Sequence, residues 1–522
     1  MNTYLTKSIS YSPLSAAPTV ADVAKFVGLS QKQIKSCVLH RKSVDARKKS
    51  DVKFVCSYVI ETDGFPKNCA PHAIPKNVLE TAQWLCRRSV VVVGSGPAGL
   101  FAALYLLKSG AKVLLLERGA DVVERKAAVD EFFAGGKFRP DVNVQFGLGG
   151  AGTFSDGKLT SGISSPLTRT VFEQFVKSGA PDEIMYSATP HVGTDKLVGV
   201  VANMRDEIFS LGGKILFNTK LTNLQTGGGA ICGVVAESAG KTLVFPCDDV
   251  VLAVGHSARD TFRSLYEQGV EMRFKPFAVG VRVEHDRAFI SRAQYGKLAE
   301  THRDFASANY KMAANFDDGR SCYTFCMCPG GTVVAANSTE NSVVVNGMSN
   351  FDRMADFSNS ALVVNVSESD VGSGVFGGVE FQEKLERDCF LFGGGDYVAP
   401  AQNVVDFLAH RPSDVISSNC SYPRGVRPSN LWDVLPQFVC QTLEKGLVEF
   451  GKKISGFDRC GTLIAVESRT SSPVKVLRDA DSLQSVSFSG LYPCGEGAGY
   501  AGGIVSAAVD GLRVAIKIVE KC

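Results

Sequence analysis

The stretch between Ser89 and Gly119 reads SVVVVGSGPAGLFAALYLLKSGAKVLLLERG, and it constrains the fold more than any other part of the chain. Val90–Val93 is a β-branched run, which predicts a short strand buried on both faces. Three glycines in a G-x-G-x-x-G spacing follow, and an apolar helical run and a second apolar strand come after them. Strand, glycine turn, helix and strand in this order predict a parallel α/β unit.

Each of the three glycines has its own physical role. Gly94 allows the tight turn, Gly96 lets the backbone approach a pyrophosphate, and Gly99 lets the helix pack closely on the strand. The helix N-terminus offers free N–H groups and a positive dipole end to the phosphates. Glu117 ends the second strand, where a carboxylate can hold the hydroxyls of a ribose. The motif predicts a dinucleotide cofactor, but it does not choose between FAD and NAD.

The overall composition limits the classes of protein to which the chain can belong. A chain of 522 residues suits two or three domains, and a net charge of +3 is too small to argue for a nucleic-acid or membrane partner. The 15 cysteines are scattered without a C-x-x-C pair, which indicates reduced thiols in an intracellular protein and no metal site. The N-terminal segment has no signal-peptide pattern and no apolar run suits a membrane span, so we expect the cytoplasm by default.

The order of the expected elements divides the chain into four parts and predicts an α/β fold. The first part is a small α+β domain with a helix at 19–27, strands at 36–39 and 53–60, a basic turn at 40–49 and a linker at 66–75. The expected divisions are 1–86 for that domain, 87–268 for the first part of the dinucleotide-binding domain, 269–487 for an inserted mixed α+β substrate domain, and 488–522 for the closing strand and helix.

A glycine-rich segment, FGLGGAGTFSDGKLTSG, begins at Phe146. So much glycine mixed with small polar residues predicts a loop that presents backbone N–H groups and small side chains to a ligand. Lys158 is a candidate to face a phosphate or a flavin ring. The candidate contacts in this loop are Gly150, Gly152, Thr153, Asp156 and Lys158.

Several strings in the chain resemble those of known flavoproteins. VVGSGPAGLFAA, LAVGHSARD and YPCGEGAGYAGGI resemble the three FAD-contact regions of glutathione-reductase-type flavoproteins. FGLGGAGTFSDGKL, FCMCPGG, ESRTSSPV and SAAVDG resemble a narrower group, the uncharacterised FAD-dependent dehydrogenases, which also carry a small N-terminal domain. The resemblance covers essentially the whole chain. It implies a glutathione-reductase-type FAD-binding domain and FAD as cofactor, but no substrate.

The resemblance also implies which residues hold the cofactor. The glycine turn would hold the pyrophosphate, Glu117 and Arg118 would lie at the adenosine ribose, and Gly495-Glu496 stands where such flavoproteins usually have Gly-Asp. The glycines before the last helix would face the flavin ring, whose reduced anion the helix dipole can stabilise. The residues assigned in this way are Gly94, Gly96, Pro97, Ala98, Gly99, Glu117, Arg118, Leu221, Ala253, Gly255, Gly495, Glu496, Gly502, Gly503 and Ile504.

Two motifs that the sequence lacks limit the reactions we expect the protein to catalyse. Disulfide reductases of this fold carry a cysteine pair soon after the first βαβ unit, whereas residues 87–231 contain no cysteine. The sequence has no second G-x-G-x-x-G, so NAD(P)H, if it is the donor, is expected to dock transiently.

Two stretches are candidates for the substrate site. Cys326 and Cys328 are two residues apart, so on a regular strand they would face the same side, either as structural thiols or as a thiol near the flavin. Arg469 stands among hydroxyl side chains, which suits a carboxylate or phosphate group, although a structural ion pair is the alternative. Arg282 and His256 are weaker candidates.

The sequence therefore predicts an FAD-dependent oxidoreductase acting on a small molecule by hydride transfer. It leaves open whether the enzyme oxidises C–H or C–N bonds or reduces an activated C=C bond as an NAD(P)H-dependent ene-reductase. A second class is a flavin-containing module that binds nucleic acid or protein through the basic turn at 41–49, and a tRNA-modifying flavoenzyme would combine both. The oligomeric state is open.

Overall fold

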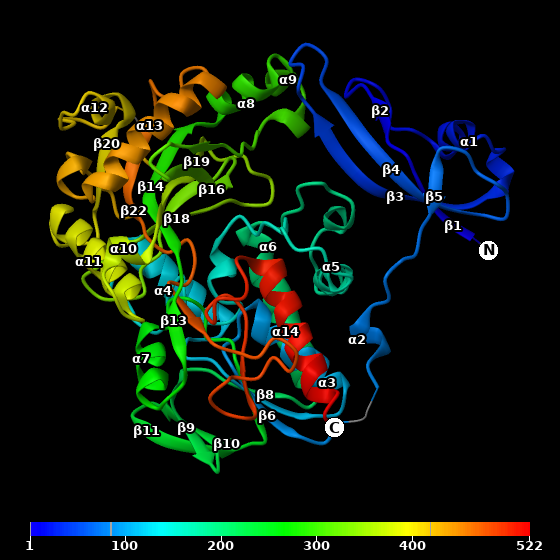
Figure 1. Cartoon of the computed structure of the whole chain (residues 1–522). Coiled ribbons are helices and arrows are strands. Elements are labelled where there is room, and N and C mark those ends of the chain that lie inside the picture. The colour runs from blue at the N-terminus through cyan, green and yellow to red at the C-terminus, as the bar shows by residue number, and fades with distance from the viewer. Residues whose placement is uncertain (1, 84–85, 418) are drawn as a thin grey trace.

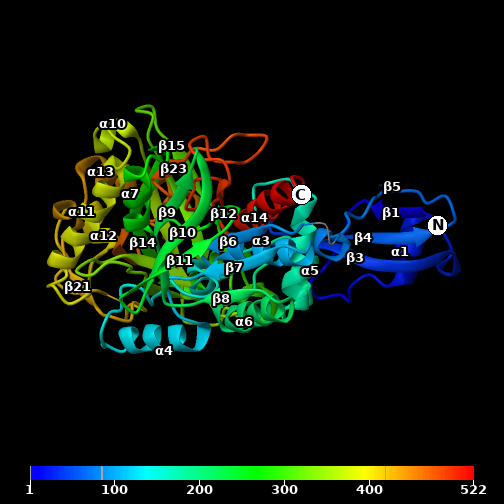
Figure 2. The same ribbon diagram turned by 90° about the horizontal axis from the view of Figure 1, so that it is seen from below.

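The computed structural model describes residues 2–83, 86–417 and 419–522. A small β-sheet domain lies at one end of the molecule, and two large sheets with their helices form the body (Figures 1 and 2). No helix among these described residues is both long and apolar enough to cross a membrane.

The N-terminal sheet is built around β4, which pairs with β3 along one edge and with β1 and β2 along the other. Helix α1 (Val20–Val27) packs its buried valines on this sheet, and the side chain of Thr19 caps its N-terminus. The strands are β1 (Asn2–Thr6), β2 (Ile9–Tyr11), β3 (Ile34–Asp45), β4 (Lys53–Thr62) and β5 (Cys69–Pro71).

Two local predictions for this domain are wrong. Strand β3 continues to Asp45 because residues 42–45 pair with β4, so the basic turn begins later than expected. The expected linker at 66–75 contains β5, which pairs with β1. Within the basic run, Lys42 forms an ion pair with Asp304 at 3.3 Å, and Arg47 pairs with Asp45 at 2.6 Å.

The central sheet is parallel, in the order β24-β12-β6-β7-β8. The valines of β6 are buried on both faces, as the sequence predicts. Helix α3 follows β6 directly, and the C-terminal α14 packs along it (Figure 1). The elements are β6 (Ser89–Val93), α3 (Pro97–Lys108), β7 (Lys112–Leu116), α5 (Leu167–Lys177), α6 (Thr194–Ser210), β8 (Lys214–Leu216), β12 (Asp249–Leu252), β24 (Leu491–Pro493) and α14 (Ile504–Val519).

An antiparallel three-stranded sheet and two helices flank the parallel sheet. Helix α4 carries Arg125, whose fully buried guanidinium donates to the backbone carbonyls of Asn143, Val144, Gly147 and Leu148. One side chain thereby holds the start of the glycine-rich loop. The elements are α4 (Val122–Phe133), β9 (Thr219–Gly227), β10 (Ala230–Ser238), β11 (Lys241–Pro246) and α7 (Arg259–Glu267).

The second large sheet is mixed, in the order β15-β16-β19-β14-β22-β20-β21. Apolar residues of its central strands and of α11 and α13 form one core. Its strands are β14 (Phe277–Asp286), β15 (Ala313–Asn315), β16 (Ser321–Cys328), β19 (Phe357–Val366), β20 (Ala399–Asn403), β21 (Val426–Pro428) and β22 (Thr462–Glu467). Two separate two-stranded sheets pair β13 (Met272–Phe274) with β23 (Val474–Val476) and β17 (Thr332–Ala335) with β18 (Val345–Met348). The helices beyond the parallel sheet are α2 (Val78–Thr81), α8 (Arg287–Tyr295), α9 (Leu298–Thr301), α10 (Glu368–Val371), α11 (Gly377–Phe392), α12 (Val404–Leu408) and α13 (Gln437–Lys453).

Chain segments far apart in sequence meet in both large sheets. The C-terminal β24 pairs with β12, so the last residues complete the parallel sheet that β6 begins. β13 pairs with β23 beside the mixed sheet. The exact domain boundaries stay predictions.

The expectation that the cysteines are reduced thiols is wrong for one pair. Cys86 and Cys522 form a disulfide that joins the segment before β6 to the end of the chain. The two residues are separated by 436 positions in the sequence and lie together because α14 runs back along α3.

The contact between α3 and α14 depends on glycine. A Cβ on Gly511, in α14, would overlap the carbonyl oxygen of Ala98 in α3. We expect Gly511→Ala to lower stability by about 1–3 kcal/mol, because the two helices must separate. Gly199→Ala in α6 is the matched control: a Cβ there meets nothing within 4 Å, and we expect a gain of about 0.5–1 kcal/mol from helix propensity. Thermal unfolding of both variants measures this difference, and equal midpoints would contradict the packing argument.

Candidate functional site

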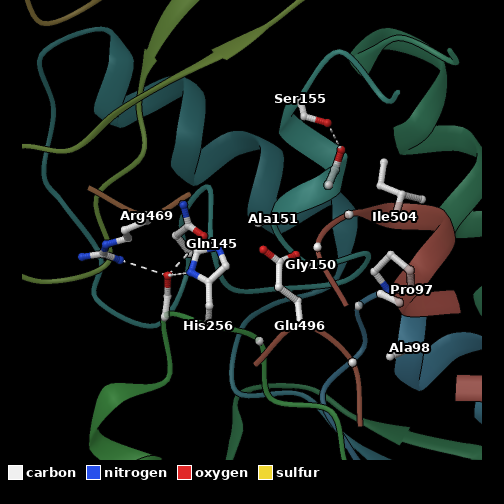
Figure 3. A pocket seen from close by; sticks show the side chains of 18 of the residues that line it. Pro97, Ala98, Gln145, Gly150, Ala151, Ser155, His256, Arg469, Glu496 and Ile504 are labelled. Atoms are coloured by element: carbon white, nitrogen blue, oxygen red, sulfur yellow. Dashed lines mark hydrogen bonds between the residues drawn. The ribbon is translucent and has the colours of Figure 1, made fainter. Parts of the chain in front are cut away.

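A large cavity, with a volume of about 650 Å³, lies where the carboxyl ends of β6 and β12 face the mixed sheet. The edge of a parallel sheet at the strand carboxyl ends is where α/β folds bind their ligands. Figure 3 shows Pro97 and Ala98 of α3 on one side, Glu496 in the middle, and His256 with Arg469 on the other.

The cavity brings together most of the residues that the sequence predicts. The predicted residues that line it are Gly94, Gly96, Pro97, Ala98, Glu117, Arg118, Gly150, Gly152, Asp156, Lys158, Leu221, Ala253, Gly255, His256, Cys326, Arg469, Gly495, Glu496, Gly502, Gly503 and Ile504. Gly99, Thr153, Arg282 and Cys328 are not among its lining residues. Gly99 packs α3 on β6, since a Cβ there would overlap the carbonyl oxygen of Gly94.

Two helix N-termini open into the cavity without a capping side chain. Gly96 precedes α3 and Gly503 precedes α14, and neither helix has a side-chain hydrogen bond at its N-cap. The first N–H groups of a helix need an acceptor, which an anionic ligand can provide. A Cβ on Gly502 would meet nothing within 4 Å, so the space in front of α14 is open. The residues therefore fit a dinucleotide whose pyrophosphate lies at α3 and whose ring system reaches α14.

Glu117 is buried at the cavity wall and accepts four hydrogen bonds. The backbone N–H and the hydroxyl of Ser95 donate to one carboxylate oxygen at 2.9 and 2.6 Å. The N–H groups of Gly119 and Gly147 donate to the other at 2.8 and 3.0 Å. Glu117 thus joins the glycine turn to the glycine-rich loop, and its contact with a ribose stays a prediction.

Glu496 lies on the cavity wall, between Pro97 on one side and His256 on the other (Figure 3). Burial raises the pKa of its carboxyl from the ordinary 4.5 to about 7, although Lys275 opposes the shift. The side chain is therefore close to half-protonated at neutral pH.

Asp156 and Lys158 of the glycine-rich loop lie close to His191. Arg353 donates to both oxygens of Asp156, at 2.9 and 2.5 Å, and this pairing lowers the pKa of Asp156 despite its burial. Burial and the charge of Arg353 lower the pKa of His191 to about 4, so its ring is neutral at pH 7. Lys158 forms no ion pair within the described part of the chain, so its charge remains available at the cavity wall.

The guanidinium of Arg469 is bound within a buried network of charged side chains. It donates through two nitrogens to Glu386, at 3.0 and 2.7 Å, and Arg259 binds the same carboxylate at 2.9 and 2.7 Å. Both guanidiniums lower the pKa of Glu386 strongly. The sequence left open whether Arg469 binds a substrate anion or a protein carboxylate. Its observed partner is Glu386, and a substrate contact stays a prediction.

The hydroxyl of Ser257 connects this network to the cavity. It receives a hydrogen bond from Arg469 at 3.0 Å, donates to the side-chain oxygen of Gln145 at 3.2 Å, and lies 3.1 Å from Nδ1 of His256 (Figure 3). Burial and the nearby guanidiniums lower the pKa of His256 to about 3, so the imidazole is neutral.

Cys326 and Cys328 do not occupy equivalent positions. Cys326 lines the cavity and is half-buried, whereas Cys328 is fully buried beneath it. The expected alternation along a regular strand is wrong here, because β16 shifts register against β19 between Phe325 and Cys328. Arg282 donates to the backbone oxygen of Cys326 at 3.0 Å and is held by a buried ion pair with Glu467.

Sequence reasoning missed several residues of the cavity wall. Gln145, Tyr310, Asn346 and Arg353 lie in segments without a recognisable motif, and Ser257 lies in the LAVGHSARD motif but was not singled out there. The sequence held two weak signals for these residues. One is the asparagine before a glycine at 346–347, and the other is the presence of polar residues at buried strand positions. Only the tertiary contacts bring these residues to the cavity.

The fold and the cavity define an FAD-dependent flavoprotein of the glutathione-reductase type. Residues 88–263 match a family model described as pyridine nucleotide-disulphide oxidoreductase, and residues 276–470 match one described as FAD-dependent protein, C-terminal domain-like. Residues 18–61 match a domain of unknown function. These matches support FAD as the cofactor, and the FAD-dependent resemblance seen in the sequence is confirmed.

An uncharacterized protein of Clostridium beijerinckii is 42% identical over 517 residues, covering 96% of this chain and 95% of that one. The chain therefore belongs to the same family as that protein, a family of FAD-dependent flavoproteins.

The solved structures are less similar to this chain than the Clostridium beijerinckii protein is. Glycine oxidase from Bacillus cereus is 11% identical, with a TM-score of 0.36 over 83% of this chain and 95% of that one. CtdE in complex with FAD is 13% identical, with a TM-score of 0.32 over 83% and 84%. Thermovibrio ammonificans THI4 is 18% identical, with a TM-score of 0.24; the match spans 36% of this chain and 64% of that one.

Among residues 2–83, 86–417 and 419–522, no group of three or more histidine, cysteine or acidic side chains is arranged to hold a metal ion.

The hydrogen bonds of Glu117 lead to a testable prediction. In Glu117→Gln, an amide NH₂ replaces one of the two acceptor oxygens. Either the two donors of Ser95 or the N–H groups of Gly119 and Gly147 then lose their acceptor, at a cost of about 1–3 kcal/mol. We expect a lower unfolding midpoint and faster loss of FAD on dilution. Glu124→Gln, at an exposed position of α4, is the control and should behave as the wild type. Unchanged FAD retention in Glu117→Gln would show that these loops do not need the carboxylate.

The raised pKa of Glu496 predicts a pH dependence for the apoprotein. Between pH 4.5 and about 7 the unfolded carboxyl loses its proton while the folded one keeps it, so stability from this group falls as pH rises. Above that window the contribution is constant. We expect Glu496→Gln to remove the dependence, so its advantage in unfolding midpoint is larger at pH 8 than at pH 5. An advantage independent of pH would contradict the shift.

Proposed function

We propose that the protein is an FAD-dependent oxidoreductase, a dehydrogenase or reductase, that exchanges a hydride between the flavin and a small-molecule substrate. The observation that carries the proposal is the continuity of the cavity, which runs from the glycine turn before α3 to side chains of the mixed sheet. A cofactor-binding wall and a chemically different wall thus enclose the same space, as in a ligand site formed between two domains.

The residues of the glycine turn and of both helix N-termini are proposed to hold FAD: Gly94, Gly96, Pro97, Ala98 and Gly99 at the pyrophosphate, and Gly502, Gly503 and Ile504 at the ring. When bound, FAD supplies the two-electron chemistry. Gly150, Gly152, Thr153, Asp156 and Lys158 are proposed to enclose it from the glycine-rich loop. The remaining proposed contacts are Glu117, Arg118, Leu221, Ala253, Gly255, Gly495 and Glu496.

The opposite wall is proposed to bind the substrate. Cys326 offers a thiol there, and Lys311 and Asn309 lie exposed at the rim. Lys158 adds a positive charge from the glycine-rich loop that faces this wall. Lys158 would favour a substrate with a carboxylate or an enolate-type oxygen. Arg469 acts in this proposal through Ser257 and His256, by holding a neutral imidazole at the wall rather than by contacting an anion.

The binding-module alternative has less support. Lys42 and Arg47 already pair with carboxylates of the chain. The backbone of Lys42 also pairs with residues 186–188, immediately before Thr189 and Pro190 of the cavity rim. The N-terminal domain is therefore proposed to support the rim of the cavity.

Absorbance of the purified protein tests the proposal. We expect a flavin spectrum, and heat should release the flavin as FAD. Anaerobic addition of NADH or NADPH separates the classes: bleaching within seconds identifies a reductase, including an ene-reductase. An oxidised flavin that only an organic substrate bleaches identifies a dehydrogenase.

Gly96→Ala provides the structural control. The nearest atom to its new Cβ is the Cα of Gly150 at 3.9 Å, so the fold accommodates the methyl group. The methyl group would enter the space proposed for the pyrophosphate, and we expect FAD affinity to fall at least tenfold with little change in folding. A wild-type protein without flavin, or Gly96→Ala with unchanged FAD affinity, would overturn the assignment.

A further inference from the structure

The backbone between Phe325 and Cys328 departs from a regular strand. Phe325 pairs with Ala361 and Cys328 with Asn359, so β16 holds one residue more than β19 in the same interval. This is a β-bulge, and Cys326 within it has a φ of 43°. A positive φ is uncommon for a residue with a side chain and requires support from its surroundings.

Two cysteines separated by one residue lie at the edge of the range of disulfide geometry. In an extended strand, Cα atoms two residues apart are separated by roughly 6.6–6.8 Å. Disulfides span Cα separations of about 4.4–6.8 Å, so an extended strand lies at the upper limit. The thiol of Cys328 donates to the backbone oxygen of Cys326 at 3.4 Å, so its side chain turns back toward Cys326.

The buried guanidinium of Arg282 contacts both cysteines. The Arg282 guanidinium is fully buried and lies 3.9 Å from the sulfur of Cys328, while also holding the backbone oxygen of Cys326. The hydrogen bond from Cys328, with the charges of Lys158 and Arg282, lowers the pKa of Cys326. The same contact raises the pKa of Cys328. The charges of Lys158 and Arg282 therefore favour a thiolate at the cavity, and Cys328 lies buried behind it.

Cys322 lies on the same strand, β16, but does not share the properties of Cys326. Position on β16 alone therefore does not produce them. Cys322 is fully buried, and burial raises its pKa to about 12. It packs against α13, where Gly446 leaves room for its sulfur. Cys322 is therefore an internal reference for an unreactive thiol.

We propose that Cys326 and Cys328 form a redox-active dithiol, which closes reversibly to a disulfide by exchange with small-molecule disulfides that enter the cavity. The Cys326 thiolate attacks one sulfur of the disulfide R–S–S–R and displaces the first thiolate. The Cys328 thiol loses its proton and attacks the sulfur of Cys326, and the second thiolate leaves. The two protein thiols lose two electrons and two protons, and R–S–S–R gains them as two molecules of R–SH.

This assignment does not depend on hydride transfer at the flavin. It places a second two-electron group on the wall proposed to bind substrate, in a segment far from the position of cysteine pairs in the disulfide reductases of this fold.

Thiol mapping of the holoprotein tests the proposal. The protein is reduced with dithiothreitol, freed of reductant anaerobically, and mixed with bis(2-hydroxyethyl) disulfide at neutral pH. After an acid quench, alkylation under denaturing conditions and digestion, mass spectrometry locates each cysteine. We expect an internal disulfide between Cys326 and Cys328, with Cys322 alkylated. The exposed Cys232 and Cys460 should carry mixed disulfides only, which shows that the reagent is active.

Single variants separate the two roles. In Cys328→Ser we expect a mixed disulfide to accumulate on Cys326, because the resolving thiol is absent. In Cys326→Ser we expect Cys328 to stay unmodified during the same time. Cys322→Ser is the matched control and should form the internal disulfide as the wild type does. FAD absorbance and circular dichroism confirm that each variant is folded.

Two results would overturn the proposal: a wild-type protein that keeps both thiols while Cys232 and Cys460 carry mixed disulfides, or one in which a mixed disulfide on Cys326 is never resolved. Neither result depends on a nicotinamide donor or on flavin reduction. A failure here is therefore distinct from a failure of the proposed oxidoreductase function, which the anaerobic absorbance experiment tests separately.

Discussion

The structure depends on the close approach of α3 to β6 on one side and to α14 on the other. Gly99 allows the first contact and Gly511 the second, because a Cβ at either position would overlap a backbone carbonyl oxygen. Packing at this distance aligns α3 and α14, so that their uncapped N-termini open into one cavity. The same glycines that let the core close therefore also provide the two sites of positive helix potential to which an anionic dinucleotide can bind.

Buried charge organises the rest of the cavity wall. Arg125 holds the glycine-rich loop through backbone carbonyls, and Glu117 holds it through backbone N–H groups. On the opposite wall, Glu386 neutralises one of two guanidiniums, and Arg282 with Glu467 supports the bulge of Cys326. Because an unpaired buried charge is costly, each of these side chains fixes its partner's position. A wall built in this way is rigid, which suits a site that must hold a substrate against a ring system.

Sequence reasoning succeeded where the signal was local. The valines of β6, the glycine turn and the helix expected at 19–27 depend on neighbours within a few residues, and the structure has each of them. It failed where pairing is long-range. β5 lies in a segment that looks like a linker, and β3 is longer than its apolar pattern, because both are completed by hydrogen bonds to other strands. The bulge at Cys326 also depends on the register of β19 and leaves no mark in the spacing of the two cysteines.

The sequence by itself determined the parallel α/β unit, the dinucleotide turn and the set of glycines that a cofactor could approach. These follow from the size, branching and backbone freedom of adjacent residues. Only the tertiary structure decided that Arg469 pairs with Glu386, that Cys326 faces the cavity while Cys328 lies beneath it, and that Cys86 meets Cys522. The physical reason is that a contact between distant residues is set by how whole elements pack, and no local pattern records the partner that packing will bring.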